Sequence, residues 1–311
     1  MDSENWVVLG VDLGSTTAKA VVVDPAGAIR GFSVVQMGAV SREAVTRAID
    51  DALAAADVDP DAVRRTVSTG YGRKLVPGAD RSFTEITCHA RGAAAMRPGV
   101  RLVIDIGGQD SKVILVDDAG LVDRFAMNDR CASGTGRFFD VLARALEVDI
   151  SEIGDLTLQG SDDLEISSMC ATFAETEVIS LLAQGQRKSD IAASVHKAVS
   201  ARTLGLVAQV GKATPTVMTG GVAKNPAARH YLSRALRHEV DVLDQPQIAG
   251  AYGAGLLALD EYLGSRDHDR ETAIGAGIAA RHTASVPHCA SCDGVLNNTS
   301  TPVVLDIGRK H

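Results

Sequence analysis

Residues 7–17 read VVLGVDLGSTT, and residues 102–110 read LVIDIGGQD. Each stretch runs from β-branched residues into an aspartate and a glycine turn, and a second apolar segment and a reverse turn follow, so each predicts a β-hairpin. The two units match at a constant offset of 93 residues, which pairs Asp12 with Asp105, Gly14 with Gly107, Lys19 with Lys112, Asp24 with Asp117, Gly27 with Gly120 and Phe32 with Phe125. An internal match of this kind indicates a duplicated hairpin at the head of two similar lobes.

The glycine turns have the composition of a phosphate-binding site. Glycines let backbone N–H groups approach phosphate oxygens, and the hydroxyls of residues 15–17 add further donors. The two aspartates are suited to hold a hydrated Mg²⁺ ion. A single Asp-x-Gly sequence is more often an ordinary β-turn, but two in register favour a nucleotide bound between the lobes.

A third glycine turn lies in residues 217–225, VMTGGVAKN, after a β-branched stretch and before an expected helix. Backbone amides at a helix start can contact a nucleoside or its phosphates. The chain has neither the P-loop pattern Gly-x-x-x-x-Gly-Lys-Ser/Thr nor a dinucleotide fingerprint. The three turns resemble the phosphate-1, phosphate-2 and adenosine motifs of the actin, Hsp70 and sugar-kinase superfamily. This resemblance implies an α/β fold of two ribonuclease-H-like lobes with a nucleotide cleft between them.

The composition is that of an ordinary globular protein, with 311 residues, 45% of them hydrophobic, and a formal net charge of -8. Because there is no Lys/Arg block, neither nucleic acid nor an anionic membrane is expected as a partner. Residues 1–5, MDSEN, lack the basic region of a signal peptide, and no apolar run reaches the ~18 residues of a membrane helix. We therefore expect a cytoplasmic protein whose five cysteines are thiols.

Two cysteines stand just before expected amphipathic helices. Cys131 lies in residues 128–136, NDRCASGTG, and Cys170 lies in residues 166–172, ISSMCAT. Helix amino termini favour the thiolate, which is the form that binds metals. Two thiolates are too few for a zinc or iron–sulfur site, but a symmetric dimer would supply four. A small buried thiol at each position, or a disulfide between the two, stays open at this point.

The cysteine segments, together with residues 69–73 (TGYGR), 85–90 (EITCHA) and 246–254 (PQIAGAYGA), resemble the BadF/BadG/BcrA/BcrD ATPase family. Within that family they are most similar to the activators of 2-hydroxyacyl-CoA dehydratases. The resemblance implies a homodimer, or a dimer with a similar ATPase subunit, that binds ATP or ADP with Mg²⁺ and shares one [4Fe-4S] cluster. It also implies electron transfer from a ferredoxin or flavodoxin to a CoA-thioester enzyme, either a 2-hydroxyacyl-CoA dehydratase or benzoyl-CoA reductase.

The same resemblance assigns roles by position. Asp12 and Asp105 would serve Mg²⁺ and the attacking water, with Gln109 near the γ-phosphate, and Cys131 and Cys170 would bind the cluster. The residues expected to face the phosphates are Gly14, Ser15, Thr16, Thr17, Gly107, Gly108, Gly134, Thr135 and Gly136, and those expected to face the nucleoside are Gly220, Gly221 and Val222.

The domain boundaries follow from the repeat and from composition. We expect residues 1–98 to form the first lobe, with a helix over 247–263 returning to it, and residues 99–246 to form the second lobe, which carries the cluster cysteines. Residues 264–311 are a polar extension beyond the family pattern. Its Cys289-Ala290-Ser291-Cys292 segment has metal-ligand spacing, but a disordered or partner-binding tail is the favoured interpretation.

Two other functions compete with the ATPase activator. A small-molecule kinase of the same superfamily would need a carboxylate base aimed at a substrate hydroxyl, and it would leave Cys131 and Cys170 unexplained. A chaperone-like ATPase would need a peptide-binding domain, and the tail is too short and polar for one. Cys88 and His89 adjoin on an expected helix, and we interpret them as a buried thiol and a helix-end imidazole without an assigned role.

Overall fold

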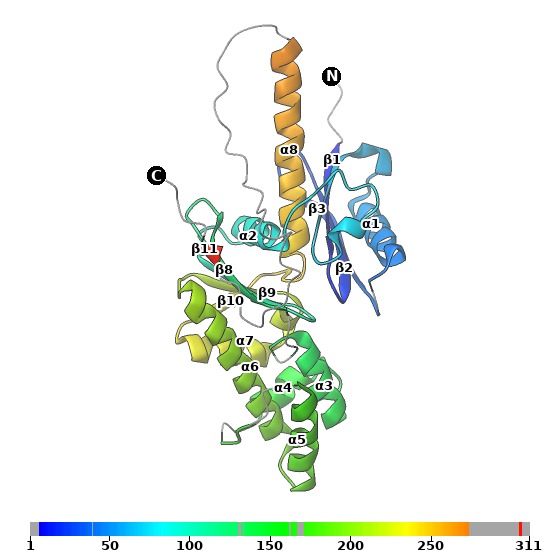
Figure 1. Cartoon of the computed structure of the whole chain (residues 1–311). Helices are drawn as coiled ribbons and strands as arrows, with labels where there is room; N and C mark the ends of the chain where they lie inside the picture. Colours follow the sequence, from blue (N-terminus) through cyan, green and yellow to red (C-terminus); the bar gives the residue numbers. More distant parts are fainter. Residues whose placement is uncertain are drawn as a thin grey trace.

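The structure is a computed structural model, and it describes residues 6–38, 40–129, 132, 134–161, 163–166, 171–273 and 305–306. Within these residues the chain forms two mixed β-sheets with helices packed on their faces (Figure 1). Cys131, Cys170, Cys289 and Cys292 lie outside the described residues. None of the described helices is long and apolar enough to cross a membrane.

The first sheet has five strands in the order β3-β2-β1-β4-β5. These strands are β1 (Val7–Leu13), β2 (Thr17–Val23), β3 (Ile29–Gln36), β4 (Val63–Thr69) and β5 (Arg81–Ser82). Every residue of β1 is buried, as expected for a central strand covered on both faces. Helix α1 (Arg42–Ala56) covers one face, where Val45, Ala48 and Ala52 share a core with apolar side chains of β1 and β2. Two short 3₁₀ helices, η1 (Pro60–Ala62) and η2 (Arg73–Leu75), flank β4.

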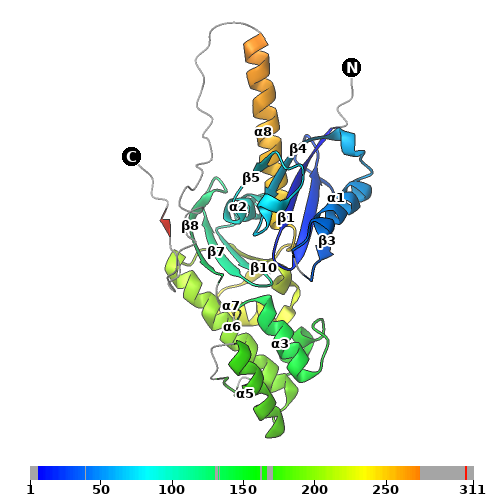
Figure 2. The same ribbon diagram turned by 45° about the vertical axis from the view of Figure 1, so that its right-hand side comes forward.

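The second sheet has six strands in the order β10-β9-β6-β7-β8-β11. These strands are β6 (Leu102–Ile106), β7 (Ser111–Val116), β8 (Val122–Asn128), β9 (Thr216–Thr219), β10 (Val240–Val242) and β11 (Leu305–Asp306). The helices on this side are α3 (Gly136–Leu146), α4 (Ile153–Leu158), α5 (Ala171–Ala183), α6 (Lys188–Val210) and α7 (Pro226–Leu236), with a 3₁₀ helix η3 (Gly221–Lys224) before α7. They share one apolar core with the sheet, and Figure 2 shows α3, α5 and α6 extending away from it.

The duplicated hairpin that the repeat predicts is confirmed by the strand pairing. β1 pairs antiparallel with β2 and places Asp12 opposite Lys19, while β6 pairs antiparallel with β7 and places Asp105 opposite Lys112. In both sheets a third strand, β3 or β8, extends the antiparallel hairpin, and a parallel strand, β4 or β9, lies on the other side of the first strand. The two sheets therefore share one topology around their central strands.

The turns of the two hairpins also repeat in detail. The Gly14 N–H donates to the Thr17 carbonyl at 3.0 Å, and the Gly107 N–H donates to the Asp110 carbonyl at 2.9 Å. In the reverse turns at the far ends, an Asp carboxylate accepts from two backbone N–H groups in each case, at Asp24 and at Asp117. These side chains fix the turn geometry locally, so both hairpins follow from short-range sequence.

Two helices cross over between the sheets. α2 (Glu85–Met96) follows the first sheet in the sequence, but its apolar side chains join the core of the second sheet. α8 (Ala249–Ala273) follows the second sheet and packs on the first. The two helices meet backbone to backbone because a Cβ at Gly92 or Gly253 would overlap a carbonyl oxygen of the other helix. α8 continues to Ala273, beyond the end expected near residue 263.

Candidate active site

A cavity of about 690 Å³ lies between the two sheets, where the hairpin turns face each other. All three glycine turns contribute to its wall, and so does the first part of α2. The predicted site residues on this wall are Asp12, Gly14, Ser15, Thr16, Thr17, Asp105, Gly107, Gly108, Gln109, Gly136, Gly220, Gly221 and Val222. Segments that are far apart in the sequence thus meet at one cavity.

Two described residues of the predicted phosphate set do not line this cavity. Gly134 and Thr135 are not among the residues of its wall, and Thr135 is fully buried. The Thr135 hydroxyl donates to the Ala132 carbonyl at 2.8 Å, where the chain turns into α3. Of the Gly134–Gly136 turn, only Gly136 lies on the cavity wall.

Helix α3 begins directly against the second glycine turn. The N–H of Gly136 donates to the Gly107 carbonyl, and the N–H of Arg137 donates to the Gly108 carbonyl, both at 2.8 Å. A Cβ on Gly136 would lie 3.1 Å from the Gly107 oxygen, so the helix start and the turn are in close contact. The helix that follows Cys131 in the sequence is therefore hydrogen-bonded to a predicted phosphate-binding turn.

The glycine turns touch one another across the cavity. A Cβ on Gly108 would lie 2.5 Å from the Thr16 hydroxyl, so the approach of the two hairpins requires glycine there. At the third turn, Gly220 has a φ of +84°, and a Cβ on it would overlap the Ile106 carbonyl. These two positions need glycine for space and for backbone conformation.

The carboxylate of the first hairpin, Asp12, is buried at the end of β1 and pairs with Lys19 at 3.1 Å. Among the described residues, Lys19 Nζ is the single hydrogen-bond donor to this carboxylate. The backbones of Gly70 and Gly250 pack against it, because a Cβ on either would approach a carboxylate oxygen closely. The other lone pairs of Asp12 are thus suited to coordinate a cation or to accept a hydrogen bond from water.

The carboxylate of the second hairpin, Asp105, has three donors. Lys112 Nζ lies 3.0 Å from its Oδ2, the Thr219 hydroxyl donates to its Oδ1 at 2.9 Å, and His89 Nε2 lies 3.3 Å from the same oxygen. Burial alone raises the pKa of Asp105, but the charges of His89 and Lys112 and their hydrogen bonds hold it well below its ordinary value. Asp105 is therefore a fixed carboxylate anion.

Lys112 is the centre of a buried charge cluster. Besides Asp105, it contacts Asp110 at 2.6 Å and Glu85 at 3.7 Å, and only 2% of the residue is exposed. Burial by itself lowers the pKa of Lys112, but these three carboxylates raise it well above its ordinary value. Burial raises the pKa of Glu85, and Lys112 partly offsets this. The ammonium of Lys112 thus stays charged beside the cavity.

Four further residues line the cavity although their local sequence does not indicate a role for them: Lys19, Glu85, His89 and Lys112. The two lysines match in the internal repeat, which is a signal for shared function. Glu85 and His89 are one helical turn apart at the start of α2, so they share a face of that helix. That this face meets Asp105 depends on the crossing of α2 to the second sheet, which the local sequence does not encode.

Cys88, adjacent to His89, does not share its environment. Its side chain is fully buried in the core between α8 and the first sheet. Burial raises the pKa of this thiol to about 12, so it is protonated and unreactive.

The third glycine turn and the loop before α4 form another part of the cavity wall. Its residues include Ile150, Ser151, Lys224 and Asn225. Asn225 caps α7 by accepting from two of its backbone N–H groups. Its Nδ2 also lies 2.9 Å from Nε2 of the buried His196, whose Nδ1 donates to the Ala192 carbonyl at 2.8 Å. Burial lowers the pKa of His196 to about 4, so a neutral imidazole accepts from Asn225.

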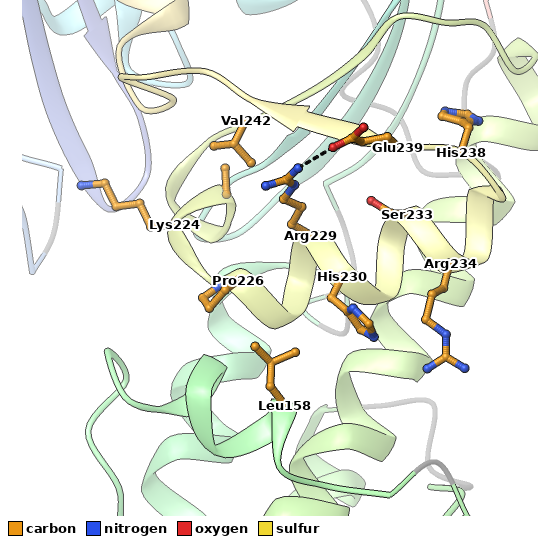
Figure 3. A pocket seen from close by; sticks show the side chains of 11 residues that line it. Leu158, Lys224, Pro226, Arg229, His230, Ser233, Arg234, His238, Glu239 and Val242 are labelled. Atoms are coloured by element: carbon orange, nitrogen blue, oxygen red, sulfur yellow. Dashed lines mark hydrogen bonds and ion pairs between the residues drawn. The ribbon is translucent and has the colours of Figure 1, made fainter.

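A second hollow, of about 760 Å³, lies on the outer side of α7 (Figure 3). Arg229 crosses it to pair with Glu239 at 2.9 Å, and exposed Leu158 of α4 lies on the opposite side. Lys224 contributes to both walls, but the two aspartates and the hairpin turns face only the first cavity. We therefore place the active site between the sheets.

The two lobes have the fold of actin-like ATPases and sugar kinases. A solved glucokinase of the ROK family from Streptomyces griseus, in complex with glucose and AMPPNP, shares the fold with a TM-score of 0.51 over 82% of the chain, at 17% identity. The model of the BadF/BadG/BcrA/BcrD ATPase family matches residues 9–258. The chain belongs to this family, as its motifs indicated.

Several relatives are much closer than the glucokinase. The activator of lactoyl-CoA dehydratase from Anaerotignum propionicum is 43% identical over 81% of this chain and 97% of its own length. The activator of 2-hydroxyisocaproyl-CoA dehydratase from Clostridium difficile, solved with bound ADPNP, superposes with a TM-score of 0.80 at 37% identity, covering 88% of this chain and 100% of the other. A subunit of benzoyl-CoA reductase from Thauera aromatica is 32% identical over 80% of this chain and 92% of its own length.

Proposed function

We propose that this protein hydrolyses ATP and delivers a low-potential electron, through an iron–sulfur cluster shared by two subunits, to a CoA-thioester enzyme. The observation that carries the proposal is the pair of hydrogen bonds from Gly136 and Arg137 to the second glycine turn. They connect a predicted phosphate turn with the helix that follows Cys131. The activating ATPases and dehydratase activators among the relatives support the same function.

In this proposal the nucleotide lies in the cavity between the sheets. The glycine turns supply backbone N–H groups to the phosphates, Gly220, Gly221 and Val222 face the nucleoside, and Gln109 lies near the γ-phosphate. Lys19 and Lys112 add positive charge beside the phosphates. The ADPNP bound by the structural relative is consistent with a cavity of this size.

The residues fit a Mg²⁺ ion that arrives with the nucleotide. Asp12 and Asp105 face the same cavity, while the described residues contain no cluster of three or more side chains that would hold a metal by themselves. Mg²⁺ usually takes one or two carboxylates together with phosphate oxygens and waters. Asp12, with a single donor, is the better direct ligand, and Asp105 suits a water-mediated contact.

The donor chemistry also fits a four-iron cluster if two chains combine. Each chain contributes the thiols of Cys131 and Cys170, and such a cluster takes four thiolates. The helices that follow these residues in the sequence, α3 and α5, pack against each other in the described structure. When bound, the cluster would accept and release one electron.

The contacts of α3 suggest how the nucleotide acts on the cysteine segment. Gly136 and Arg137 donate to the carbonyls of residues 107 and 108, in the turn that lines the proposed nucleotide cavity. If that turn shifts on hydrolysis, these two hydrogen bonds move the start of α3 with it. The rest of the helix then follows, because its turns form a cooperative unit. The exposed side of α3 and α5 would then present a different geometry to the partner enzyme.

Anaerobic purification followed by assay of iron and acid-labile sulfide tests the proposal. We expect about four irons per two chains in the wild type, and none in Cys131→Ala. Cys88→Ala is the matched control, since this buried thiol should leave the iron content unchanged. An iron-free wild type that transfers phosphate to a small molecule would establish a kinase instead.

The relatives include both dehydratase activators and a component of a reductase, so the electron acceptor is one of two enzyme classes. We propose the dehydratase class, because the activators are the more similar relatives. Ferredoxin or flavodoxin is the proposed donor. Isolation as a homodimer supports this choice, and copurification in a stable complex with a second ATPase subunit would favour benzoyl-CoA reductase.

A further inference from the structure

The start of α2, the helix that crosses from the first sheet to the second, brings a histidine to the aspartate of the second sheet. His89 is 6% exposed, its Nδ1 lies 3.0 Å from the Glu85 carbonyl, and its Nε2 lies 3.3 Å from Asp105 Oδ1. A carbonyl and a carboxylate can only accept, so both ring nitrogens of His89 donate. The imidazole therefore links the backbone of α2 to Asp105.

The other two donors to Asp105 belong to its own sheet. Lys112 stands on β7 and Thr219 on β9, so both move with Asp105 as one body. His89 is the donor that comes from a helix packed against α8 as well as against the second sheet. It is thus the contact through which movement of the crossing helices can reach Asp105.

Helix α8 completes the link to the first hairpin. Its residue Gly250 lies against both His89 and Asp12: a Cβ there would be 2.7 Å from the His89 ring and 3.1 Å from Asp12 Oδ2. Because α2 and α8 also meet backbone to backbone at Gly92 and Gly253, a movement of α8 with the first sheet would be transmitted to His89.

We propose that His89 is a positioning residue for ATP hydrolysis, one that aligns the Asp105 carboxylate when the two lobes close on the nucleotide. This inference rests on the proposed function, because it requires that ATP is hydrolysed in this cavity. The residue does not reach the phosphates itself in this account. It sets the orientation of Asp105, and with it the rate of hydrolysis more than the affinity for ATP.

Two amide substitutions separate the two hydrogen bonds of the imidazole. In His89→Gln the side-chain amide reaches the place of Nε2 and can still donate to Asp105, whereas in His89→Asn it reaches only the place of Nδ1. We expect His89→Asn to lower kcat about tenfold or more, with KM for ATP changed less than about threefold. We expect His89→Gln to recover most of the lost rate.

His238→Gln is the background control, because it alters a histidine hydrogen bond to Thr216 away from the cavity and should keep wild-type kcat. Thermal melting confirms that each variant is folded. Equal kcat values in the Asn and Gln variants, or a rise in KM with kcat unchanged, would overturn the assignment of His89. A wild-type protein that binds ATP without hydrolysing it would instead count against the proposed function.

Discussion

The two hairpins share a backbone and differ in how their charges are held. In the first, Asp12 pairs with Lys19, whose side chain is 13% exposed, and has no other donor among the described residues. In the second, Asp105 and Lys112 are both almost fully buried and share a network with Glu85, His89, Asp110 and Thr219. The first hairpin thus has a carboxylate with lone pairs left for a ligand, whereas the second holds its carboxylate in a fixed cluster of charges. Duplication has thus conserved the scaffold while the side chains around it have specialised.

The largest effect on stability is expected when each of the two lysines is removed in turn. Lys112→Met leaves three carboxylates near one another without their shared cation, and we expect a loss of about 3–5 kcal/mol in the free energy of unfolding. Lys19→Met removes one partner of a single, partly exposed pair, and we expect a loss of about 1–2 kcal/mol. Urea denaturation of both variants measures the difference. Equal losses would show that the two hairpins hold their charges alike.

The second prediction concerns the stability of the second lobe at acid pH, which depends on the buried His196. Its pKa is about 4 in the folded protein and near 6.5 when unfolded, so the unfolded chain binds the proton more readily between these values. The stabilisation by neutral His196 is complete above pH 6.5 and is lost as the pH falls to about 4, which amounts to roughly 3 kcal/mol. His196→Gln should show a shallower fall in stability over this window. An unchanged slope would contradict the assigned neutral state.

The smallest expected effect concerns the contact between the two hairpins. In Gly108→Ala the new methyl group meets Thr16, so the turns cannot approach as closely. We expect about tenfold weaker nucleotide binding, measured by calorimetry, because the phosphates bridge the two turns in the proposed complex. Gly205→Ala on α6, where a Cβ meets nothing within 4 Å, is the matched control and should bind normally. Equal affinities in both variants would show that the hairpins do not close on the phosphates.

The features predictable from the sequence were those encoded in short segments. Both hairpins, their turns and the glycine residues on the cavity wall follow from local composition and from the repeat. The family assignment followed from ordered motifs and is confirmed by the match over residues 9–258. Local signals sufficed because each β-branched strand leads into a glycine turn, and glycine and aspartate favour tight turns.

The features that sequence analysis missed depend on contacts between distant segments. His89 and Glu85 reach Asp105 because α2 crosses to the second sheet, and neither the helix pattern nor the repeat contains that crossing. The composition change after Leu263 also gave the wrong end for α8, since charged residues continue a helix as readily as they leave it. The expected phosphate contacts of Gly134 and Thr135 stay a prediction, because only Gly136 of that turn reaches the cavity wall.

The most direct test of the account is the electron paramagnetic resonance spectrum of anaerobically purified, dithionite-reduced protein, recorded with ADP and with a non-hydrolysable ATP analogue. We predict the signal of one reduced four-iron cluster per two chains, changed in shape by the exchange of nucleotide and absent in Cys131→Ala. A protein that binds both nucleotides but gives no iron signal, or a signal that does not respond to them, would contradict the link between the glycine turns and the cysteine segment.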